Sequence, residues 1–273
     1  MLFNYWEFLI FFPVVTILYF VIPKKVKSIW LLIARYFFYM CWNPEYILLI
    51  LFSTGATYGA GLLMDHLDKK SGIDEIKRKK QKKLVLAACL VANLGLLAFF
   101  KYFDFIVSSI NVVTQNVAGV TTTNPFDFIL PVGISFFTFQ ALGYIIDVYR
   151  HSINAERNFI RYALFVAFFP QLVAGPIERS GNLLRDIQDI PQKKMWDYKR
   201  ITSGLIIMVW GMFLKVVITD RISALADTVF SNSQGMGAAP LWIGAIAFSI
   251  QIFCDFAGYS TIAIGAARVL GFK

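Results

Sequence analysis

The segment from Phe159 to Arg179 most constrains the fold, because it is apolar enough to enter a bilayer but too short to cross one as a straight helix. Its uncharged part, Tyr162 to Ile177, has 16 residues. A helix of that length rises about 24 Å, against a hydrocarbon core about 30 Å thick. Pro170 removes a helical donor near the middle, and Gly175-Pro176 is expected to end the helix. The segment is therefore not an ordinary membrane span.

Basic residues flank this segment on both sides: Arg150, Arg157 and Arg161 before it, and Arg179, Arg185, Lys193 and Lys194 after it. Because positively charged loops stay in the cytoplasm, both flanks should face the same side of the membrane. We therefore expect a re-entrant helical hairpin that enters the bilayer and returns. Broken backbone at membrane depth is tolerated only where it packs against protein or lines a water-filled cavity. The hairpin is thus predicted to form the wall or floor of a site.

The composition places the chain among membrane proteins: of 273 residues, 58% are hydrophobic and 16% charged. The net charge of +9 comes from Lys and Arg in short loops between apolar runs. This pattern sets topology and attracts anionic headgroups, so no nucleic-acid partner is expected. Cys41, Cys89 and Cys254 are each isolated in apolar segments, so we expect neither a disulfide framework nor a metal site.

The alternation of apolar runs and basic loops predicts an all-α, polytopic integral membrane protein. We expect a single membrane domain over residues 1–273, in the inner (cytoplasmic) membrane, with the N-terminus outside and about seven transmembrane helices. The expected spans are 5–22, 29–41, 45–64, 84–103, 131–148, 201–218 and 241–257, with outer stretches at 104–130 and 219–240. In the span 45–64, Gly55 and Gly59 are expected to let helices approach closely.

Residues 65–83 carry the strongest orientation signal, with eight bases against four acids. We interpret this stretch as a solvated cytoplasmic loop that sets topology; a specific lipid-binding role is the alternative. A second polar stretch, 178–200, repeats apolar residues at near-helical spacing, namely Leu183, Leu184, Ile187 and Ile190. This pattern predicts a cytoplasmic amphipathic helix that lies on the inner membrane surface.

Few ionisable residues fall near the apolar segments: Asp147, Glu178, Asp255 and Arg268. Charges at such depth are expensive and usually face an interior cavity. Asp255 shares one helical face with Gln251 and Tyr259 by i, i+4 spacing. This face could be a polar stripe buried by its neighbours or the wall of an aqueous tunnel, and the sequence leaves both open.

The two histidines are interpreted as solvated interfacial side chains. His66 opens the basic loop, and His151 ends a span beside the re-entrant segment, so a catalytic role is kept as the alternative for His151. No G-x-S-x-G, HExxH, P-loop or Cys/His cluster occurs in the sequence.

Several blocks of sequence resemble the membrane-bound O-acyltransferase (MBOAT) family. They read ILPVGISFFTFQ at 129–140, IDVYR at 146–150, FFPQLVAGPI at 168–177 and DFAGYS at 255–260. The resemblance is to the bacterial branch that acylates polysaccharides and cell-wall polymers, namely the alginate O-acetyltransferases and the D-alanyl transferases of teichoic acid. It runs in order along the whole chain.

The resemblance implies an enzyme that transfers an acyl group from an activated thioester to hydroxyls of an extracytoplasmic polysaccharide. We expect the acyl group to be acetyl. The donor would be coenzyme A or an acyl carrier on the cytoplasmic side, acting as substrate, with no bound cofactor. The acceptor would be a glycan or a periplasmic or extracellular acyltransferase partner. Family members form a ring of helices around a thinned centre, where a histidine acts as general base.

In the family, that histidine follows the block at 255–260 by a few dozen residues, in a Trp-His segment. The chain ends at Lys273, and neither His66 nor His151 lies in the matching context, so no catalytic residue is assigned. Thr261 also stands where the family usually has an acid. We expect the N-terminal part of a longer acyltransferase, inactive alone.

Supporting roles are assigned to nine residues by the resemblance. The tunnel would be lined by Gln140 and Asp147, and the re-entrant turn would be shaped by Gln171, Gly175 and Pro176. The cytoplasmic mouth, where the donor enters, would be flanked by Glu178 and Arg179. The histidine would be faced by Asp255 and Tyr259. Two alternatives remain: a catalytically inactive scaffold or truncated paralogue in polysaccharide modification or export, and a transporter. A transporter should show broken helices in two halves, and only one is found.

Overall fold

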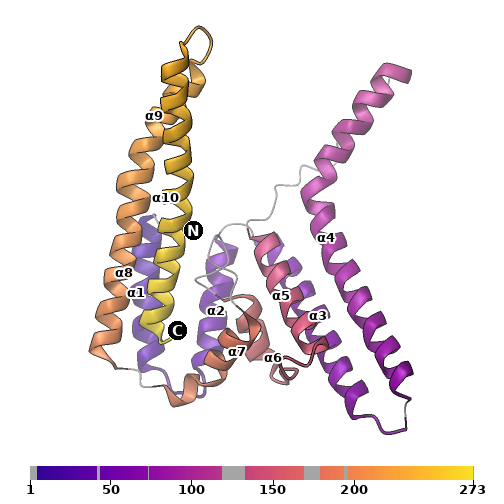
Figure 1. Ribbon diagram of the computed structural model, residues 1–273. Coiled ribbons are helices and arrows are strands. Elements are labelled where there is room, and N and C mark those ends of the chain that lie inside the picture. The colour runs from indigo at the N-terminus through magenta and orange to yellow at the C-terminus, as the bar shows by residue number, and fades with distance from the viewer. Residues whose placement is uncertain are drawn as a thin grey trace. The chain divides into compact units, whose positions relative to one another are not determined.

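The computed structural model describes residues 5–41, 44–72, 74–118, 133–168, 179–193 and 196–272, and all regular structure within these ranges is helical (Figure 1). The predicted all-α class is therefore confirmed. The helices fall into two compact units. The prediction of a single membrane domain over residues 1–273 stays a prediction.

The first unit contains α1 and α2, the end of α7, and α8 to α10. The bounds of its helices are α1 Trp6–Val21, α2 Lys27–Met40, η2 Ile190–Gln192, α8 Tyr198–Met212, η3 Phe213–Thr219, α9 Asp220–Ser231 and α10 Ala238–Leu270. The segment η3 is π-helical and joins α8 to α9 without a break.

The second unit contains α3 to α6 and the start of α7. The bounds of its helices are η1 Pro44–Tyr46, α3 Ile47–Lys69, α4 Glu75–Ala118, α5 Ile134–Tyr149, α6 Phe159–Val166 and α7 Ser180–Gln188. The helix α7 begins in the second unit and ends in the first.

Four helices in the described ranges are long and apolar enough to cross a membrane: Ile47–Lys69, Glu75–Val112, Tyr198–Ser231 and Ala238–Leu270. Two shorter apolar helices, α1 and α5, have 16 residues each. The chain is thus a multi-pass membrane protein by its helices. The count of seven spans and the re-entrant hairpin stay predictions.

Two helices run farther than predicted. The helix α4 continues through Asp104 to Ala118, because no proline interrupts it and one acidic residue does not end a helix. The helix that begins at Tyr198 continues past Thr219 to Ser231. The turn that follows contains Gly235 at φ 87°, and Pro240 lies in the first turn of α10, where its missing N–H costs nothing.

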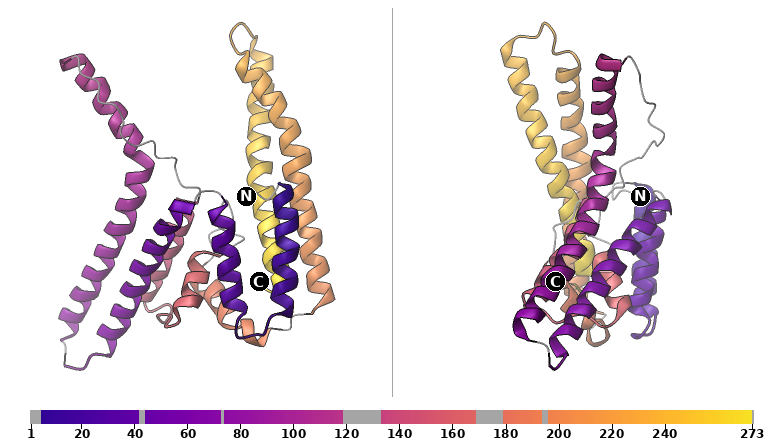
Figure 2. Two further views of the ribbon diagram at one scale, coloured as in Figure 1. Left: turned by 180° about the vertical axis from the view of Figure 1, so that it is seen from behind. Right: turned by 90° about the vertical axis from the view of Figure 1, so that its right-hand side faces the viewer.

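The helices α8 and α10 lie side by side, and glycines bring their backbones into contact (Figure 2). A Cβ atom on Gly211 would lie 2.7 Å from the carbonyl oxygen of Gly258, and one on Gly265 would lie 2.6 Å from that of Gly204. The glycines are spaced by seven residues in both helices, so each pair faces the other helix two turns apart. We call these four residues the glycine seam.

The close approach predicted at Gly55 and Gly59 is not found, since a Cβ atom on either would meet no described atom within 4 Å. In α3 the contact is made instead by Gly61, whose Cβ position lies 3.1 Å from the ring of Tyr144.

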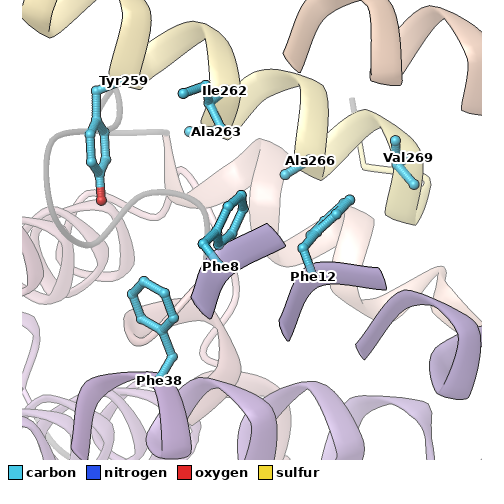
Figure 3. Close-up of a cluster of buried hydrophobic side chains, with 8 residues drawn as sticks. All are labelled: Phe8, Phe12, Phe38, Tyr259, Ile262, Ala263, Ala266 and Val269. Carbon is cyan, nitrogen blue, oxygen red and sulfur yellow. The ribbon is translucent and has the colours of Figure 1, made fainter. Parts of the chain in front are cut away.

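A hydrophobic cluster anchors α1 and α2 to α10 in the first unit (Figure 3). Its buried members are Phe8, Phe12, Phe38, Tyr259, Ile262, Ala263, Ala266 and Val269. The side of α10 that carries this cluster is adjacent to the glycine seam, so α10 is packed on two sides along its C-terminal half.

The predicted amphipathic helix exists as α7 and η2, but its apolar face packs against protein rather than lying on the membrane surface. The four apolar residues that define it, Leu183, Leu184, Ile187 and Ile190, are all buried. Lys193 follows with its ammonium 4.4 Å from the ring centroid of Phe272 and 3.1 Å from Asp186. Burial lowers the pKa of Lys193, and the Asp186 carboxylate opposes this shift.

Substituting Gly211 with alanine should destabilise the protein by about 1–3 kcal/mol, because the added methyl group overlaps the backbone of α10. The matched control is Gly59→Ala, which adds the same group to a helix where no described atom opposes it. That variant should be neutral or slightly stabilising. Thermal unfolding midpoints in detergent measure both. Equal shifts would contradict a seam specific to α8 and α10.

Candidate functional site

Gln140, a predicted tunnel residue, is buried on α5 and donates a hydrogen bond from Nε2 to the carbonyl oxygen of Phe165 at 2.7 Å. Phe165 lies in the last turn of α6, where carbonyl groups lack helical partners. Gln140 therefore supplies a missing hydrogen bond to the end of the short helix that opens the predicted re-entrant segment.

The other end of α6 is also held by side chains. The Asn158 side chain accepts hydrogen bonds from the backbone N–H groups of Ile160 and Arg161 at 3.0 and 3.2 Å, which makes it the N-cap of the helix. The Glu156 carboxylate accepts from the N–H of Asn158, and the N–H of Glu156 donates to the hydroxyl of Tyr144. The residue before α6 thus carries an N-cap signal that our reading of the sequence missed.

Asp147 accepts a hydrogen bond from the hydroxyl of Ser180. This contact ties the C-terminal turn of α5 to the first residue of α7, and Arg179 lies exposed immediately before it. The structure therefore brings Asp147 and Arg179 to neighbouring positions at one end of the second unit.

Four of the predicted residues, Gln171, Gly175, Pro176 and Glu178, lie outside the described residues, as does Pro170. The turn of the re-entrant segment and the acidic side of the donor entrance therefore stay predictions.

Asp255 forms an ion pair with Lys215, which projects from the π-helical segment η3. The side chains are 40% and 19% exposed, respectively. No role was assigned to Lys215 from the sequence. A lone lysine in an apolar run is itself a signal, because a cation at such depth needs a counter-ion. π-helical segments occur frequently at functional sites.

Tyr259 lies one turn after Asp255 and is buried in the hydrophobic cluster with Phe8 and Phe38 (Figure 3). Of the predicted polar face, Asp255 is thus paired with a lysine, and the Tyr259 ring is packed among apolar side chains.

His151 is 67% exposed at the end of α5, and His66 is exposed in the last turn of α3. Among the described residues, no group of three or more His, Cys, Asp or Glu side chains is arranged to hold a metal ion.

Removing either member of the Lys215–Asp255 pair should destabilise the protein by roughly 1–3 kcal/mol, because the partner is left as an uncompensated charge among apolar helices. The double variant Lys215→Met/Asp255→Leu should recover most of that loss. A double-mutant cycle of unfolding midpoints in detergent measures the coupling. Additive losses would contradict a functional pairing of the two groups.

The sequence of the chain is similar to the sequences of several known proteins. The chain is 35% identical over 264 residues to a probable alginate O-acetylase AlgI of Pseudomonas aeruginosa, which covers 97% of this chain and 48% of the relative. It is 32% identical over 292 residues to a peptidoglycan O-acetyltransferase of Helicobacter pylori, with 96% and 53% covered. A teichoic acid D-alanyltransferase of Bacillus subtilis is 24% identical over 156 residues, with 55% and 38% covered.

No family model matches the chain. The chain spans about half the length of the curated relatives to which it is most similar over its full extent. Similarity to acetylases of two different polymers nevertheless extends across nearly all of its residues, in an all-helical membrane protein. The resemblance drawn from the sequence blocks is thereby confirmed: over nearly its whole length the chain is similar to alginate O-acetylases and to a peptidoglycan O-acetyltransferase.

Proposed function

We propose that the chain forms part of a membrane-bound O-acyltransferase that transfers an acetyl group to hydroxyls of an extracytoplasmic polysaccharide. The observation that carries this proposal is the similarity, at 32–35% identity over 96–97% of the chain, to proteins named as alginate O-acetylases and a peptidoglycan O-acetyltransferase. These names share one reaction, acetyl transfer to a polymer, and differ in the acceptor.

The donor in this proposal is an acetyl thioester, carried by coenzyme A or by an acyl carrier, that approaches from the cytoplasmic side. In this proposal Arg179, which is exposed next to Ser180, attracts the phosphate-bearing arm of such a donor; its exposure supports this role. The seven spans, the re-entrant hairpin and an outer N-terminus in the inner membrane belong to the same proposal, since they let donor and acceptor meet from opposite faces.

The general base in this proposal is the family's histidine, which would be supplied by a segment that this chain does not contain. The relatives are about twice as long as the region they share with the chain, which supports this view. The chain alone is then expected to be inactive. A non-catalytic scaffold in polysaccharide modification is the second candidate, since neither His66 nor His151 lies in the sequence context of the family's histidine.

The test joins the chain to the C-terminal part of an alginate O-acetylase relative and follows labelled acetyl transfer from acetyl-coenzyme A to purified glycans in membrane vesicles. We expect transfer by the joined protein, none by the chain alone, and loss of transfer after a His→Ala change in the Trp-His segment. A joined protein that folds and inserts but transfers nothing would favour the scaffold.

In the active joined protein, Arg179→Gln should raise the KM for the thioester donor roughly ten-fold while leaving kcat unchanged, because one charge-assisted contact to the donor is lost. Arg185→Gln is the matched control, since it removes the same charge from an exposed position on α7. Steady-state kinetics with varied donor concentration separates them. An equal rise in both variants would indicate general charge attraction and not a contact at Arg179.

A further inference from the structure

A cavity of about 510 Å³ opens at the basic end of the second unit, between the end of α3, the first turns of α4 and the end of α5. Its basic lining residues on α4 are Arg78, Lys79 and Lys82. Tyr149, the last residue of α5, and His151, which follows that helix, also line it. The acids Asp68 and Glu75 complete the lining. Residues 65–83, which supply most of it, carry eight bases against four acids.

The floor of the cavity is a connected set of three side chains centred on the buried Lys82. Lys82 is buried, and its ammonium lies 2.9 and 2.7 Å from the two carboxylate oxygens of Asp68 and 3.0 Å from Nε2 of His151. It also lies 5.9 Å from the centroid of the Tyr149 ring. The Lys82 and Asp68 charges therefore cancel, and the charge left for a ligand is that of Arg78 and Lys79 against Glu75.

His151 reaches this floor in a left-handed backbone conformation, at φ 58°. It occupies the position after the C-cap of α5 that glycine usually fills. Its N–H donates to the carbonyl oxygen of Val148, and the N–H of Ser152 donates to that of Asp147, as in a Schellman motif. A side chain in that conformation costs roughly 1–2 kcal/mol. The contact with Lys82 offsets part of this cost and keeps the imidazole at the cavity.

Arg78 carries a donor that no described residue satisfies. Its Nη2 lies 3.4 Å from the carbonyl oxygen of Lys70, whereas its Nε is buried and has no hydrogen-bond partner among the described residues. Arg78 also lines the cavity, where a guanidinium forms charge-assisted hydrogen bonds with the oxygen of an anion. The start of α4 at Glu75 adds the positive end of the helix dipole on the same side.

We propose that this cavity binds one phosphate group, with Arg78 and Lys79 as its donors and the Lys82–Asp68–His151 arrangement as its floor. The cavity lies at the ends of two helices, α3 and α4, that are long and apolar enough to cross a membrane, so an anionic lipid headgroup is the source within easiest reach. Soluble phosphate offers the same chemistry. This proposal does not depend on the acyltransferase activity.

The test measures the thermal unfolding midpoint of the purified protein in neutral detergent at fixed ionic strength. Phosphatidylglycerol, phosphatidylcholine and inorganic phosphate are titrated separately, with chloride as the salt control. We expect phosphatidylglycerol to raise the midpoint and phosphatidylcholine to leave it unchanged. In Arg78→Gln/Lys79→Gln the phosphatidylglycerol concentration for half of the shift should rise roughly ten- to thirty-fold, because about 1 kcal/mol is lost with each charge.

The matched control is Lys77→Gln/Lys80→Gln, which removes two charges from the opposite face of the same turns of α4 and should titrate like the unchanged protein. If inorganic phosphate alone reproduces the shift and the Arg78/Lys79 variant abolishes it, the phosphate site stands with a soluble ligand. Equal weakening in both double variants would mean diffuse attraction and would overturn the proposal. So would the absence of any shift in the unchanged protein.

Discussion

The second unit depends on satisfying the backbone groups at the ends of the short helix α6. The hydrogen bond from Gln140 to the carbonyl oxygen of Phe165 contributes to this. An apolar helix of only eight residues exposes unsatisfied backbone groups at both ends, and a bilayer offers them no water. In this protein Gln140 satisfies one carbonyl group at the C-terminal end, and Asn158 satisfies two N–H groups at the N-terminal end. Neighbouring side chains therefore supply part of the hydrogen bonding that further helical turns would supply.

Polar side chains join the longer helices of the same unit in the same way. Ser53 on α3 donates to the Oδ1 of Asn93 on α4 at 2.6 Å. The amide of Asn93 in turn donates to the carbonyl oxygen of Cys89 on the same helix. Tyr162 on α6 donates to Thr57 on α3 at 2.6 Å. These polar side chains are buried and paired, so they specify which helix faces meet where apolar contacts alone would not.

Much of the fold was predictable, because hydrophobic runs and basic loops report directly on membrane insertion. The helical class, the amphipathic pattern of Leu183 and Ile187 and the positions of Gln140 and Asp147 on one helix followed from that pattern. The length of α4 did not, since its polar stretch after Asp104 reads equally as loop or helix. The pairing of Lys215 with Asp255 was not predicted either, because the two residues are forty positions apart and no local periodicity links them.

The glycine seam has a consequence for how α8 and α10 can move. Because the backbones touch at two levels, a slide by one residue would drive a side chain such as Val269 or Ile262 into the opposite main chain. The two helices therefore have a single register and are expected to move together as one rigid pair. A rearrangement of the first unit is then expected to move α8 and α10 together, with bending at the segments that connect this helix pair to the rest of the unit.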